Sequence, residues 1–171
     1  RDGEELAMLD ELAGTMDLAI ERLRHLLFEL RPPALDREGI IPALQLYLRE
    51  AGTDVEYRLD GDIDREPPPE TRVILYRLAQ EALTNVRKHA RATRAAVEIR
   101  DHEDGYRLSV TDDGVGFALD ATASAPGHLG LASMRERAEL AGGWLQIHTE
   151  PGAGTTIDCW LPAGRRIPAG A

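Results

Sequence analysis

The side chains of Glu81 and Asn85 stand four residues apart in a stretch whose apolar residues repeat with helical spacing. At about 100° per residue, such positions lie one above the other, here along the edge of the apolar arc. A carboxylate and an amide oxygen placed there suit a magnesium ion, which prefers hard oxygen ligands and keeps several waters. Lys88 and His89 follow one turn later on the same side. The alternative is a solvated helix flank with an ordinary glutamate–lysine pair.

A second candidate group lies in residues 112–117, DDGVGF, where an alternating strand pattern ends. Asp112 closes the strand, and Gly114 and Gly116 follow it. A carboxylate fixed at a strand end can accept a hydrogen bond from an exocyclic amine such as that of adenine. Glycine lets the backbone approach a ligand closely, because no β-carbon intervenes. A glycine-rich turn without a ligand is the alternative.

Two further glycine-bearing segments are candidates for contact with a nucleotide. Residues 127–131, GHLGL, form a loop that runs directly into a helix predicted over 131–141. A helix N-terminus presents unpaired amides and the positive end of the helix dipole, which favour phosphate oxygens. Residues 152–156, GAGTT, precede the last predicted strand and either pass close to the nucleotide or form a simple hairpin turn.

Hydropathy patterns predict the elements that must position these residues. Heptad spacing from Leu6 to Leu30 predicts one long helix, which Pro32 and Pro33 end. It packs either on the rest of the chain or in a bundle with another helix and a second subunit. Further helices are predicted over 39–51, 70–90 and 131–141. Strands are predicted around 55–59, 97–100, 106–110, 145–147 and 157–161. The expected fold is α+β, a mixed and mainly antiparallel sheet with helices on one face.

Composition narrows the class of protein. The chain has 171 residues with 43% hydrophobic residues, enough to bury a core. A net charge of −10 argues against nucleic acid as the main partner, because a duplex binder needs a basic face. No apolar run approaches the length of about 18 residues that a membrane helix needs. The single cysteine, Cys159, cannot form an intrachain disulfide, so we expect this segment to lie in the cytoplasm. That expectation holds whether or not the full-length protein is anchored in a membrane.

Taken together, the order and spacing of these segments resemble the GHKL ATPases, and within them the sensor histidine kinases of the nitrate-sensor-like subgroup. Residues 80–90, QEALTNVRKHA, are similar to the N box of that subgroup. Residues 112–117 resemble its G1 box, and 128–138, HLGLASMRERA, resemble its G2 region. Residues 152–156 resemble the closing glycine–threonine turn, and 30–36, LRPPALD, resemble the junction between dimerisation helix and ATPase domain.

The resemblance implies a Bergerat-type α/β sandwich that binds ATP and Mg²⁺, preceded by the long N-terminal helix. It implies that Asn85 ligates magnesium and that Glu81 polarises a magnesium-bound water or acts as a base. Asp112 is expected to hold the adenine amine. A short lid over 118–126 is expected to be mobile without nucleotide. The other implied nucleotide contacts are Lys88, His89, Gly114, Gly116, Phe117, His128, Gly130, Leu131 and Thr156.

The resemblance also implies a division into parts. Residues 1–32 are expected to be the second helix of a dimerisation and phosphotransfer bundle whose first helix is missing. Residues 33–166 are expected to form the ATP-binding catalytic domain, and 167–171 a disordered tail. None of the five histidines has both the helical position and the acidic neighbour of the family's phosphoacceptor. We therefore expect this chain to bind ATP without phosphorylating itself.

The implied function is transfer of the γ-phosphoryl group to a histidine upstream of this sequence, for relay to an aspartate of a response regulator receiver domain. The full-length protein is expected to be a homodimer, with no nucleic acid partner and no membrane contact from this segment. One alternative is another GHKL enzyme, such as an anti-sigma-type serine kinase. A second is a non-catalytic, nucleotide-sensing dimer module.

Overall fold

The computed structural model describes residues 32–118 and 128–164. The chain divides into two compact units, Arg1–Pro32 and Pro33–Ala171, and the second contains every element described below. The predicted long helix over 6–30, the predicted lid beyond residue 118 and the predicted tail over 167–171 lie outside the described residues.

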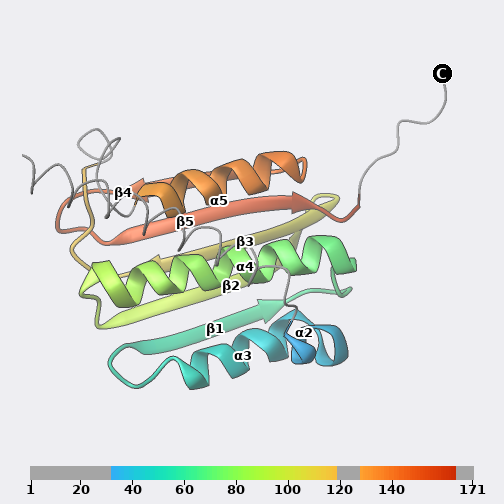
Figure 1. The fold of residues 1–171 in the computed structure, drawn as a ribbon, viewed down its shortest axis with the longest axis horizontal. Helices are drawn as coiled ribbons and strands as arrows, with labels where there is room; N and C mark the ends of the chain where they lie inside the picture. The colour runs from blue at the N-terminus through green and yellow to red at the C-terminus, as the bar shows by residue number, and fades with distance from the viewer. Residues whose placement is uncertain (1–31, 119–127, 165–171) are drawn as a thin grey trace, which may run out of the picture. The chain divides into compact units, whose positions relative to one another are not determined.

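A five-stranded sheet with the order β1-β2-β3-β5-β4 forms the centre of the second unit (Figure 1). β1 runs parallel to β2, and every other neighbouring pair is antiparallel. The prediction of a mixed, mainly antiparallel sheet is therefore confirmed. The strands are β1 (Glu56–Asp62), β2 (Arg94–His102), β3 (Gly105–Asp112), β4 (Trp144–Thr149) and β5 (Thr155–Pro162).

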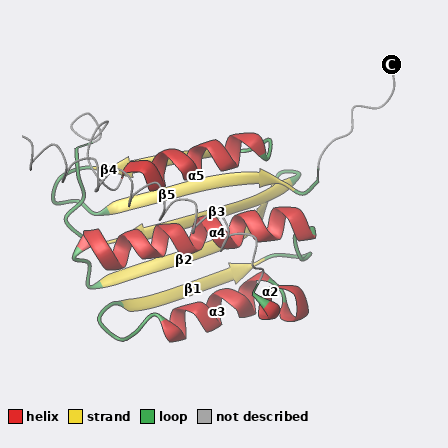
Figure 2. Cartoon of the chain, in the orientation of Figure 1, coloured by secondary structure: helices red, strands yellow, loops and turns green. Residues whose placement is uncertain are grey.

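Helices lie against one face of this sheet, as Figure 2 shows. α4 contacts β3 and β5, α5 contacts β4 and β5, and α3 contacts β1. The predicted helix over 70–90 is an α-helix that passes into a π-helical turn at its end, and the predicted helix over 131–141 begins three residues earlier. The bounds are α2 (Pro33–Glu38), α3 (Ile40–Glu50), α4 (Pro69–Asn85), the π-helix η1 (Val86–Ala90) and α5 (His128–Leu140).

The core fills the space between the helices and the sheet. Because side chains alternate along a strand, every second residue of each strand faces the helices. Removing this apolar surface from water is the main favourable contribution to folding. The buried residues that α4, α5 and the three central strands contribute include Leu75, Leu78, Leu83, Met134, Ala138, Val97, Ile99, Leu108, Val110, Cys159 and Leu161.

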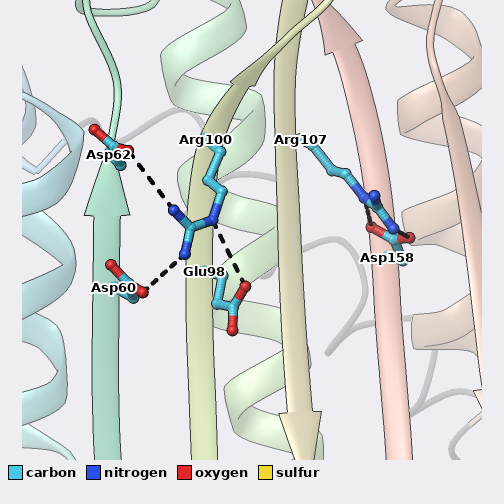
Figure 3. A network of polar contacts seen from close by, with 6 residues as sticks. All are labelled: Asp60, Asp62, Glu98, Arg100, Arg107 and Asp158. Atoms are coloured by element: carbon cyan, nitrogen blue, oxygen red, sulfur yellow. Dashed lines mark hydrogen bonds and ion pairs between the residues drawn. The ribbon is translucent and has the colours of Figure 1, made fainter.

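The opposite face of the sheet is polar and carries ion pairs between strands (Figure 3). Arg107 on β3 holds Asp158 on β5 with two hydrogen bonds, and this contact raises the pKa of the Arg107 guanidinium. Arg100 on β2 pairs with three carboxylates, those of Asp60, Asp62 and Glu98. The fold is therefore a two-layer sandwich with one apolar and one polar sheet face. Within residues 32–118 and 128–164, every helix is too short or too polar to cross a membrane.

Candidate functional site

An open cavity of about 210 Å³ lies between α4, η1 and the adjoining ends of β3 and β5. It is far larger than the space that one water molecule needs. Its walls are mostly apolar, with a few polar groups that converge on it, and this is the composition of ligand sites. The apolar lining is Ala82, Val86, Ala90, Val110, Phe117, Leu131 and Ile157, and the polar side chains are Asn85, His89, Asp112 and Thr155.

The π-helical turn η1 gives the cavity its helical wall. A π-turn contains one more residue than an α-helical turn, and such turns are frequent at functional sites. Asn85 and His89, at the two ends of this turn, both line the cavity. Lys88 is exposed and does not line it. The turn ends at Arg91 in the left-handed conformation, with φ of 51°.

The side-chain amide of Asn85 is a buried polar group in need of a partner. Its Nδ2 atom is buried and has no hydrogen-bond partner among the described residues. Burying such a group without a partner costs about 1–3 kcal/mol. The same amide group carries a donor nitrogen and an acceptor oxygen. Asn85 can therefore offer the cavity either a hydrogen-bond donor or an oxygen ligand.

Asp112 also lines the cavity and is only 8% exposed. Its Oδ1 accepts a hydrogen bond from the backbone amide of Gly114 at 2.8 Å. Burial raises the pKa of this carboxyl, and this effect outweighs the opposite effect of the Gly114 and Thr155 backbone amides. An ionised carboxylate has only acceptor oxygens, so Asp112 presents an acceptor to any ligand in the cavity.

The loop that follows β3 packs tightly against its neighbours through two glycines. A β-carbon on Gly114 would collide with the carbonyl oxygen of Ala90, and one on Gly116 with that of Glu150. Gly116 also has φ of 57°, a region that favours glycine. The amide of Val115 donates to the Ala90 carbonyl oxygen at 2.8 Å. The loop that follows Asp112 is thereby fixed to the end of η1.

Asp113, which the sequence analysis did not single out, fastens β3 to the start of β2. Its Oδ1 accepts hydrogen bonds from the backbone amides of Thr93 and Arg94, each at 2.8 Å. Its Oδ2 accepts one from the Thr93 hydroxyl at 2.7 Å. These bonds, the Arg94 amide first, hold the pKa of Asp113 well below its usual range. Asp113 therefore points away from the cavity lining and stabilises the strand ends around it.

The comparisons with known proteins agree with this geometry. The family model described as "Histidine kinase-, DNA gyrase B-, and HSP90-like ATPase" matches residues 70–165, which is more than half of the chain. The chain belongs to this ATPase family. The matched segment contains α4 from its second residue on, η1, the loop after β3, α5 and β5, and so every residue that lines the cavity.

Known relatives place this ATPase domain among those of sensor histidine kinases. The histidine-protein kinase/phosphatase DegS of Brevibacillus brevis is 34% identical over 93% of this chain and 42% of its own length. NarS of Mycobacterium tuberculosis is 36% identical over 90% of this chain and 36% of its own length. The chain thus spans less than half of these relatives. The histidine kinase domain of the blue-light activated kinase EL346 of Erythrobacter litoralis superposes with a TM-score of 0.55, at 25% identity, over 71% of this chain and 57% of that domain.

The glycine–threonine turn of this ATPase domain differs from the expectation in one residue. Thr156 faces the polar side of the sheet, where its hydroxyl lies 3.1 Å from that of Thr111. Thr155 lines the cavity in its place. Strand alternation is the reason, since β5 begins at Thr155 and its odd-numbered residues face the helices. Thr155, and not Thr156, therefore lines the cavity.

Glu81 of this ATPase domain lies beside the cavity rather than in its lining. A β-carbon added to Gly130 would meet Glu81 Oε1 at 2.6 Å, so the carboxylate rests against the first turn of α5. Gly130 was expected in a loop, but α5 begins at His128. A glycine in this turn leaves room for the Glu81 carboxylate. Glu81 is thus placed between α4 and α5.

The structure brings together part of the predicted set. The predicted residues that line the cavity are Asn85, His89, Asp112, Gly116, Phe117 and Leu131. Those that lie around it without lining it are Glu81, Lys88, Gly114, Gly130 and Thr156; His128 is the first residue of α5. Sequence reasoning missed Thr155, which the strand alternation after the turn could have indicated.

Proposed function

We propose that this domain binds ATP with Mg²⁺ and transfers the γ-phosphoryl group to a histidine upstream of this sequence, as the catalytic domain of a sensor histidine kinase. The phosphoryl group would then pass to an aspartate of a response regulator receiver domain, with the full-length protein acting as a dimer. The observation that carries the proposal is one cavity lined both by a buried acceptor, Asp112, and by an amide, Asn85, whose nitrogen has no hydrogen-bond partner among the described residues.

The Asp112 end of the cavity suits an adenine base. The flat ring would lie between apolar walls that include Val110, Leu131 and Ile157. The Gly114 amide leaves acceptor positions of the Asp112 carboxylate open, and burying a charged acceptor is costly unless donors reach it. The exocyclic amine of adenine is such a donor, whereas guanine carries an acceptor oxygen at the corresponding position. The site should therefore prefer adenine nucleotides over guanine nucleotides.

The Asn85 end suits a magnesium-bound triphosphate. Within the described residues there is no group of three or more His, Cys, Asp or Glu side chains that could hold a metal. A magnesium ion here would use the Asn85 oxygen together with phosphate oxygens and waters, a common arrangement for this ion. Magnesium, when bound, neutralises the charge of the phosphate oxygens. His89 faces the same region, and Lys88 has a flexible stem long enough to turn toward the phosphates.

Glu81 is the group that we propose for proton chemistry. Its carboxylate lies one helical turn before Asn85 and rests against Gly130. From there it can orient a magnesium-bound water, or accept the proton of the histidine's other ring nitrogen while the unprotonated nitrogen attacks the γ-phosphorus. Catalysis would then consist mainly of positioning and charge neutralisation.

Calorimetric titration with a non-hydrolysable ATP analogue, with and without magnesium, tests the binding step. We expect saturable binding that magnesium strengthens, and weaker binding of the matching GTP analogue. A folded chain that ignores adenine nucleotides at millimolar concentration would overturn the proposal.

Incubation with labelled ATP and magnesium tests the transfer step. We expect the chain alone to stay unlabelled on an alkaline gel and to label an added dimerisation bundle of its full-length parent that carries the acceptor histidine. Clear labelling of the chain itself would show that one of its five histidines is an acceptor.

A further inference from the structure

The hydroxyl of Thr149, at the end of β4, joins three segments around the cavity. It accepts a hydrogen bond from the backbone amide of Phe117 at 3.1 Å. It donates to the carbonyl oxygen of Gly154 at 3.0 Å. It also lies 3.1 Å from the hydroxyl of Thr155. Phe117 and Thr155 both line the cavity, whereas Thr149 does not.

The hydrogen-bond capacity of a threonine hydroxyl matches these three contacts. A hydroxyl has one proton to donate and two lone pairs that accept. If the Thr149 proton goes to Gly154, the two lone pairs remain for the Phe117 amide and the Thr155 hydroxyl. All three contacts are then satisfied at once, without any water. A valine at this position has a similar shape but makes none of them.

We propose that Thr149 is a positioning residue for nucleotide binding, because its hydroxyl holds Phe117 and Thr155 in place as one wall of the cavity. The inference rests on the proposed nucleotide function. A second bond supports the same junction, since the Gly152 amide donates to the Val115 carbonyl oxygen at 2.6 Å. That bond is between backbone atoms, however, so Thr149 supplies the side-chain link that a substitution can remove.

The test compares Thr149→Val with Thr149→Ser, which keeps the hydroxyl. Thr111→Val is the matched control, because it removes a hydroxyl pair on the polar face of the same sheet. Calorimetry with the ATP analogue gives the affinity, and hydrogen exchange followed by NMR gives the protection of the Phe117 amide without nucleotide.

We expect Thr149→Val to bind the analogue roughly three- to tenfold more weakly and to exchange the Phe117 amide roughly tenfold faster, as the loss of one hydrogen bond implies. Thr149→Ser and Thr111→Val should match the wild type in both measurements. If Thr149→Val does not fold, Thr149→Ala takes its place with the same expectation.

Three results would overturn the inference. One is an unprotected Phe117 amide in the wild type. Another is wild-type affinity in Thr149→Val. The third is an equal loss in Thr149→Ser, which would assign the effect to packing of the methyl group. A wild-type chain that binds no nucleotide would overturn the proposed function as well, so the two failures are distinguishable.

Discussion

Asp112 and Gly114 form a closed turn in which the carboxylate oxygen Oδ1 accepts a hydrogen bond from the backbone amide two positions later, at 2.8 Å. This bond uses one carboxylate oxygen and fixes the direction of the other. The acceptor that the cavity offers is therefore held by the backbone and does not depend on a freely rotating side chain.

Replacing Asp112 with Asn should weaken binding of the ATP analogue by roughly 10- to 100-fold, the range for a hydrogen bond to a charged group. Asparagine has only one acceptor oxygen, so it can serve either the Gly114 amide or the ligand. Circular dichroism should show an unchanged fold, and calorimetry measures the affinity. Wild-type affinity in Asp112→Asn would remove this carboxylate from the site.

The same substitution should stabilise the nucleotide-free domain at neutral pH. Burial raises the pKa of Asp112 in the folded state, so its protonated form is favoured there. Its contribution to stability is present below the ordinary aspartate pKa of about 3.9 and is lost as the pH rises through the folded value. The gain in free energy of unfolding for Asp112→Asn should therefore be larger at pH 7 than near pH 4. Urea unfolding at both pH values measures it, and a less stable variant at pH 7 contradicts the argument.

Asn85→Ala should abolish the effect of magnesium on nucleotide affinity while the domain stays folded. The variant removes the proposed oxygen ligand, and it also removes a buried atom without a partner. Affinity with magnesium should fall roughly 10- to 100-fold, the range for an interaction with a charged group. Affinity without magnesium should change little. Paired titrations give the ratio of the affinity with magnesium to the affinity without it. A ratio equal to that of the wild type would exclude Asn85 as the magnesium ligand.

Arg107→Met should destabilise the domain more than Arg100→Met does. Arg107 is the partner of Asp158, whose side chain is only 8% exposed, and its loss should cost about 1–3 kcal/mol. Arg100 pairs with carboxylates that are 37–80% exposed, so its loss should cost less than about 1 kcal/mol. Urea unfolding compares the two, and both should keep wild-type nucleotide affinity. Equal costs would contradict the role of burial.

The order and type of the elements could be predicted because they depend on local periodicity. Alternation along 55–59 and 157–161 marked strands with one buried face, and the spacing of Leu75, Leu78 and Leu83 marked a helix against the core. The single parallel pair, β1 with β2, could not be predicted in this way. It depends on which edge β1 joins, and that is decided by tertiary packing.

The site likewise divides into residues that could be predicted from local sequence and contacts that depend on tertiary packing. The glycines and Asp112 were found because their types and spacing are unusual within a short segment. Thr155 lines the cavity and Thr156 does not, because a shift of one residue along a strand reverses the face of the side chain. Thr149 lies more than thirty residues from Phe117, and nothing in the chain around it differs from an ordinary strand end. Contacts of this kind become visible only when the three segments are folded together.

The π-helical turn over 86–90 also limits how this region can vary in length. The helix before it is packed in the core, and the residue that ends it is bonded to the loop after β3. Deleting one residue between these two anchors would remove the extra residue of the π-turn and change the position of His89 relative to Asn85. An inserted residue would have to lengthen a turn whose two ends are both held in place. The stretch from Glu81 to Ala90 should therefore tolerate changes of side chain far better than any change in its number of residues.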